Sequence, residues 1–61
     1  MSQFELNVVL EGDALYNWSV YQLIKRNRQG KITDRQFGHI RARLVTFALR
    51  RFQRGERQVA A

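Results

Sequence analysis

The residue types that enzymes use for acid, base and nucleophilic chemistry are few and scattered in this sequence. His39 is the single histidine, cysteine is absent, and the five Asp and Glu residues occur singly along the chain. A general base needs a substrate pocket and a neighbour that adjusts its pKa, and a metal site needs several ligands close together. We therefore expect a protein that is not an enzyme and that has no metal, cofactor or small-molecule substrate.

Basic side chains are the functional groups that the sequence holds in excess. Residues 1–24 carry three carboxylates and no Lys or Arg, whereas residues 25–61 carry all 11 basic residues and two carboxylates, so charges of −3 and +9 give the net +6. Arginine predominates, and its planar fork suits bidentate contacts to phosphate or guanine. An excess of one charge sign in one part of a chain predicts a polyanionic partner, with nucleic acid first.

The arginines of a helix expected over residues 33–54 fall on one side of it. From Arg35 to Arg54 this side spans about 29 Å at 1.5 Å per residue, long enough to follow a phosphate backbone. Few acids are interleaved, whereas a surface that serves only solubility mixes both signs. We expect a small DNA-binding regulatory protein, with RNA as the less favoured ligand. The predicted nucleic-acid-binding residues are Lys25, Arg26, Arg28, Lys31, Arg35, Arg43, Arg50 and Arg54, with His39 on the same side.

Aromatic residues between positions 16 and 21 are the second candidate for binding. Trp18 and Tyr21 spread beyond one face of the expected helix, so they either close the core against the N-terminal segment or contact a second chain. Trp and Tyr are favoured anchors of protein interfaces. The alternative function is therefore an adaptor or inhibitor that docks on an acidic partner protein. Its predicted interface consists of Tyr16, Trp18, Tyr21 and Arg41, the last of which interrupts the apolar stripe of the second helix.

The N-terminal segment is expected to be a strand over residues 3–10. Phe4, Leu6 and Val8 alternate with polar residues, which is the period of two that places one face on a core. A lone strand needs a mate, which can be its copy in a dimer, a partner's sheet, or residues 15–21 as the second arm of a hairpin. The predicted fold class is thus α+β and mostly α.

Two helices are expected after this strand. The first covers residues 13–29, with Asp13 as N-cap and Gly30 beyond its end, although residues 15–21 also suit a strand. The second covers residues 33–54, because Thr33 and Gln36 form a capping box. A short link makes neighbouring helices pack antiparallel, so we expect a helical hairpin.

Two resemblances support this arrangement. The stretch from Leu23 to Val45, with its Gly30-Lys31-Ile32-Thr33 centre, is similar to the short helical hairpins called SHOCT domains, although Gln36 stands where those have an acidic residue. That resemblance implies the hairpin and little about function. The order strand, helix, helix also resembles ribbon-helix-helix regulators, which implies a dimer that inserts paired strands into the major groove of DNA.

Size and composition set the remaining expectations. A chain of 61 residues forms one domain with a small core, and such domains often self-associate, so we expect a homodimer. The domain should cover residues 1–55, with a frayed tail at 56–61. The lack of cysteine, of a signal-like N-terminus and of a ~20-residue apolar segment predicts a cytoplasmic protein that does not bind membranes.

Overall fold

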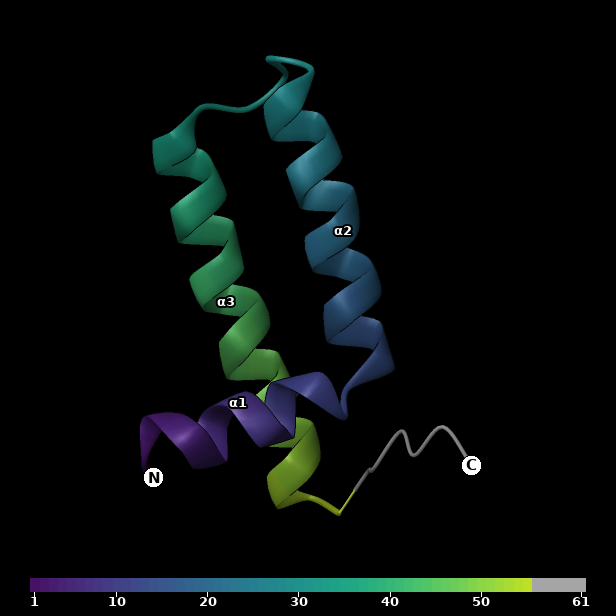
Figure 1. The fold of residues 1–61 in the computed structure, drawn as a ribbon, viewed down its shortest axis with the longest axis vertical. Helices are drawn as coiled ribbons and strands as arrows, with labels where there is room; N and C mark the ends of the chain where they lie inside the picture. The colour runs from purple at the N-terminus through teal and green to yellow at the C-terminus, as the bar shows by residue number, and fades with distance from the viewer. Residues whose placement is uncertain (56–61) are drawn as a thin grey trace.

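A computed structural model describes residues 1–55, and over that range the chain forms three α-helices (Figure 1). Helices α2 and α3 lie side by side and antiparallel, joined by a short turn at one end of the hairpin, and α1 lies across the other end. The predicted helical hairpin is confirmed. The helices are α1, Gln3–Glu11; α2, Ala14–Arg28; and α3, Asp34–Gln53.

The prediction of a strand over residues 3–10, and with it the α+β class, is wrong. These residues form α1, which begins with a capping box. The Ser2 hydroxyl accepts a hydrogen bond from the Glu5 backbone N–H at 3.1 Å, and Glu5 Oε1 accepts one from the Ser2 N–H at 3.4 Å. Such a box satisfies two backbone donors that would otherwise lack partners at the helix start.

The apolar residues of this segment also fit the spacing of one helix face, a second periodicity that is less obvious than the alternation. Leu6, Val9 and Leu10 are half-buried and follow the spacing of one helix face, while Phe4 and Val8 point outward with 75% and 54% of their surface exposed. A single strand would leave its backbone groups unpaired, whereas a helix pairs them within the segment. A helix here leaves no strand among residues 1–55 to pair in a dimer or enter a DNA groove.

Helix α2 settles the ambiguity at residues 15–21, which are helical. Asp13 is the N-cap, as predicted, and its Oδ1 accepts a hydrogen bond of 2.8 Å from the Tyr16 N–H. At the other end, Gly30 adopts φ 74°, and its N–H donates to Asn27 O, while the Lys31 N–H donates to Arg26 O. This Schellman arrangement requires a left-handed residue, which glycine adopts without steric cost.

Helix α3 has the predicted capping box at its start. The Thr33 hydroxyl accepts from the Gln36 N–H at 3.1 Å, and Gln36 Oε1 accepts from the Thr33 N–H at 2.8 Å. Asn27 holds the turn by donating to Ile32 O and to Asp34 Oδ1 at 3.2 and 2.9 Å. The helix ends before Gly55, whose φ is 75°. The tail predicted at 56–61 lies outside the described residues.

The core lies between α2 and α3 and is small. Tyr16, Leu23 and Ala48 are its buried apolar residues, and Ala48 has no exposed surface. A methyl side chain at that point allows the two helices to approach closely. No large side chain is fully buried in the described part of the chain. The half-buried residues around the core are Leu6, Val9, Leu10, Ser19, Val20, Gln22, Ile24, Asn27, Ile32, Phe37, Leu44, Val45, Leu49 and Arg51.

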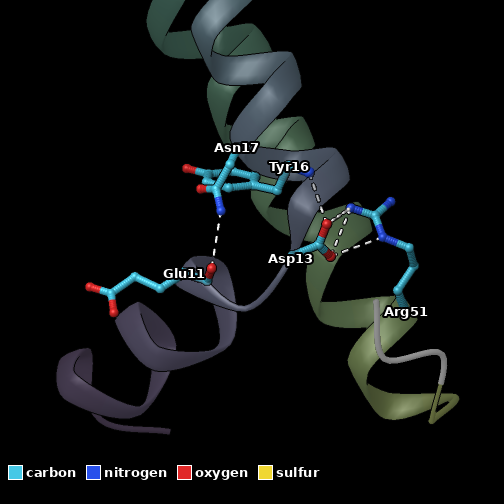
Figure 2. Close-up of polar contacts among 5 residues, drawn as sticks. All are labelled: Glu11, Asp13, Tyr16, Asn17 and Arg51. Atoms are coloured by element: carbon cyan, nitrogen blue, oxygen red, sulfur yellow. Dashed lines mark hydrogen bonds and ion pairs between the residues drawn. The ribbon is translucent and has the colours of Figure 1, made fainter. Parts of the chain in front are cut away.

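Asp13 and Arg51 join the two helices where the hairpin is open (Figure 2). Arg51 Nε and Nη2 each donate a 3.0 Å hydrogen bond to a different Asp13 carboxylate oxygen. Burial alone would raise the pKa of Asp13, but the hydrogen bonds from Arg51 and from the backbone of Tyr16, with the charge of Arg51, hold it below its usual range. Nearby, Asn17 Nδ2 donates to Glu11 O at 3.1 Å, which attaches α1 to α2.

Candidate nucleic-acid interface

The basic side of α3, which we name the arginine face, consists of Arg35, His39, Arg43, Arg50 and Arg54, and all five are exposed. At 3.6 residues per turn these positions fall within an arc of about 100°. The buried residue Ala48 and the half-buried Leu44 and Phe37 lie on the other side of the helix. Packing of α3 on α2 and α1 therefore leaves the arginine face open to solvent along most of the helix.

The charge of this face is not neutralised by neighbouring acids of the same helix. Asp34 is the only carboxylate in α3, and it accepts a hydrogen bond from Asn27 at the hairpin turn. Arg35, Arg43 and Arg50 form no hydrogen bond or ion pair with other residues of the range 1–55. Three guanidinium groups are thus available to an anionic ligand on one side of a 20-residue helix.

The second basic group, which we name the turn cluster, consists of Lys25, Arg26, Arg28 and Lys31, all exposed at the closed end of the hairpin. The concentration of basic residues at this point has a partly structural explanation, because cations near a helix C-terminus interact favourably with the helix dipole. The stretch from residue 14 to residue 33 contains no Asp or Glu, and the next carboxylate, Asp34, accepts a hydrogen bond from Asn27 in the same turn, so four cations stand beside one acid. The predicted phosphate-binding residues thus come from two parts of the fold, the outer side of α3 and the closed end of the hairpin.

A shallow, open depression lies at the start of α3, next to the turn. It is lined by Ile32, Arg35, Gln36, His39 and Ile40, with no carboxylate among them. Two side chains of the arginine face therefore border an apolar floor. This surface suits contact with an anionic ligand but does not enclose one.

Some of the predicted protein-interface residues are exposed in the structure, and one is buried. Trp18 and Tyr21 are 62% and 58% exposed, on the side of α2 that faces away from α3, whereas Tyr16 is only 8% exposed and belongs to the core. Lys25 Nζ lies 5.9 Å from the centroid of the Tyr21 ring, within the range of a cation–π contact. Leu15, 44% exposed, adds apolar surface that the sequence did not single out.

Arg41 is exposed, and the arginine that enters the helix interface is Arg51. Arg51 stands three and seven positions after Ala48 and Leu44, so it shares their face of α3, and that spacing was the available signal. Asp13 as its partner was not evident from the sequence, because the two residues are 38 positions apart.

Other kinds of site find little support in the part of the chain that the structure describes. No group of three His, Cys, Asp or Glu side chains in it could hold a metal ion. Its helices are all too short or too polar to cross a lipid bilayer. Comparison with protein-family models, with curated protein sequences and with solved structures found no significant match to this chain.

Proposed function

We propose that this protein binds nucleic acid, with phosphates held by the arginine face of α3 and by the turn cluster. The observation that carries the proposal is the exposure of Arg35, Arg43 and Arg50 on one helix face with no carboxylate paired to them in residues 1–55. Guanidinium groups bind phosphate oxygens through parallel N–H···O hydrogen bonds, which are stronger than neutral ones. A regulatory role, dimer formation and a preference for DNA belong to the same proposal.

Phosphate contacts of this kind release condensed counterions, so affinity falls as salt rises. The logarithm of the binding constant decreases with the logarithm of salt concentration by about 0.9 for each duplex phosphate neutralised. Because the arginines are solvent-exposed, each contributes mainly through this electrostatic effect, and base sequence has little influence. The protein is therefore expected to bind many sequences with similar affinity and steep salt dependence.

The test compares three variants that each lose one positive charge: Arg43→Gln, Arg50→Gln and Arg41→Gln. Binding to a duplex oligonucleotide is measured by fluorescence anisotropy from roughly 50 to 200 mM salt. Arg43→Gln and Arg50→Gln should each lower the slope by about 0.9. Arg41→Gln should leave it closer to that of the unmodified protein, because Arg41 lies outside the arginine face. Equal effects of all three variants, or binding that ignores salt, would contradict the proposal.

A partner protein is the second candidate, and the exposure of Trp18 and Tyr21 favours it. Aromatic residues in this state are frequent anchors of interfaces, and an acidic partner would also engage the arginines. The loss of Tyr16 to the core leaves two aromatic anchors. If Trp18→Ala abolished binding to a protein partner while folding and nucleic-acid affinity persisted, this second function would be supported.

A further inference from the structure

We propose that the exposed side of α2 stacks unpaired bases, so that the preferred ligand is single-stranded nucleic acid. We name this side the stacking face, and it consists of Trp18, Tyr21, Lys25 and Arg28. The inference rests on the proposed function and deepens it, because it states which form of nucleic acid is bound. It also gives a role to the two aromatic rings that the core leaves uncovered.

The four residues form one continuous stripe. Their spacing of three, four and three positions keeps them on one side of a helix, opposite the buried Tyr16. Trp18 and Tyr21 are about 4.5 Å apart along the helix axis, and the stripe from Trp18 to Arg28 is about 15 Å long. Two rings at one end and two cations at the other therefore follow each other along the same helix.

Exposure and charge together indicate the chemistry of the ligand. Proteins that bind single strands combine aromatic side chains, on which bases stack, with cations that follow the backbone. Trp18 and Tyr21 are more than half exposed, and the Lys25 ammonium lies over the Tyr21 ring, so a cation stands directly beside the aromatic surface. Lys25 and Arg28 also belong to the turn cluster, so the stripe ends among further cations that can contact the backbone.

A second copy of the chain is a poorer occupant of this face. Self-association of two stripes running in the same direction would bring Lys25 and Arg28 of one copy close to the same cations of the other. No Asp or Glu occurs between residues 14 and 33 to offset their repulsion. A polyanion offsets that charge and covers the rings at the same time.

Duplex nucleic acid fits the stacking face less well than a single strand does. In a duplex the faces of the bases are already stacked on one another, so a protein ring reaches them only after unstacking. Phosphates of a duplex remain accessible to the arginine face of α3. The two surfaces therefore predict different ligands: the arginine face binds either form, and the stacking face adds affinity for single strands alone.

Trp18 is the only tryptophan in the chain, so its fluorescence reports directly on the stacking face. The protein is titrated at low salt with an oligothymidylate, which has little secondary structure, and with a duplex of equal length, while emission and anisotropy are recorded. We expect the single strand to quench Trp18 and to bind about tenfold more tightly than the duplex. Equal or tighter duplex binding, or a bound single strand that leaves Trp18 emission unchanged, overturns the inference but not the proposed function. If neither oligonucleotide binds, both fail.

Two variants distinguish an affinity that depends on base stacking from one that depends only on the amount of exposed apolar surface. Trp18→Ala should weaken single-strand binding about tenfold and leave duplex binding unchanged. Phe4→Ala removes an even more exposed ring from α1 and should alter neither affinity. Circular dichroism should show that both variants remain helical. If the mass in solution shows a dimer that Trp18→Ala dissociates, a second copy occupies this face and the inference is wrong.

Discussion

Asp13 binds Arg51 through two hydrogen bonds of 3.0 Å, and the same carboxylate caps the first turn of α2. The side chains are 9% and 15% exposed, respectively. One carboxylate therefore accepts hydrogen bonds both from a backbone N–H in the first turn of α2 and from a guanidinium near the end of α3. The pair closes the end of the hairpin that has no connecting turn, next to the point where α1 joins.

Removing this carboxylate should destabilise the fold. Asp13→Ala removes the cap and leaves the half-buried Arg51 without its partner, so we expect a loss of roughly 3 kcal/mol in the free energy of unfolding. Asp13→Asn keeps a good N-cap and should cost less, about 1–2 kcal/mol. Urea unfolding followed by circular dichroism measures both changes. Glu11→Gln changes the net charge equally at an exposed side chain that forms no ion pair within residues 1–55, and it should alter stability by less than about 0.5 kcal/mol.

The stability of the protein should decrease in acid because of Asp13. Its pKa is lowered in the folded state, so the folded protein prefers the carboxylate more strongly than the unfolded chain does. The contribution is complete above the unfolded pKa of about 3.9 and is lost as the pH falls from there through the lower folded pKa. Urea unfolding at a series of values from about pH 6 to about pH 3 should show this loss. A curve for Asp13→Asn that declines as steeply as the unmodified one would assign the acid sensitivity to other groups.

The two glycines Gly30 and Gly38 should respond to alanine with opposite signs. Gly30 has φ 74°, where a Cβ is strained, so Gly30→Ala should destabilise the protein by about 1 kcal/mol. Gly38 lies within α3, and a Cβ there meets nothing within 4 Å. Gly38→Ala should therefore stabilise it by about 0.5–1 kcal/mol through helix propensity. Thermal unfolding of both variants gives the comparison, and a gain for Gly30→Ala would refute the Schellman turn.

The capping box of α1 gives a test of the corrected N-terminal fold. Ser2→Ala removes the hydroxyl that accepts from Glu5 and should destabilise α1 by about 1 kcal/mol, which faster amide exchange in Gln3–Glu11 would show. Thr46→Ala is the control, because that exposed hydroxyl bonds Ala42 O within α3 and caps nothing. A strand at residues 3–10 would be indifferent to Ser2→Ala, so no change in exchange would argue for the strand.

The parts of the fold that could be predicted from the sequence were mostly the residues that begin and end the helices. Asp13, the Thr33–Gln36 box and Gly30 all have the predicted roles. The Ser2–Glu5 box belongs to the same class of signal, but it was missed, because the prediction for this segment followed the alternation of apolar residues from Phe4. The exposed arginines of α3 were also predicted, since a periodic apolar stripe indicates which side is outward. Their ligand stays a prediction, as does the homodimer.

The sequence by itself determined where each helix of the hairpin begins and ends, because a cap or a left-handed turn forms between residues only three to five positions apart. Only the tertiary structure decided which apolar and charged residues are covered. Tyr16 is buried while Trp18 is exposed, and Arg51 is paired while Arg50 is open. These differences depend on which surfaces α1 and α3 cover, and the contacts join residues as far apart as Asp13 and Arg51, 38 positions along the chain. Local spacing sets the face of a helix, but burial is set by what packs against that face.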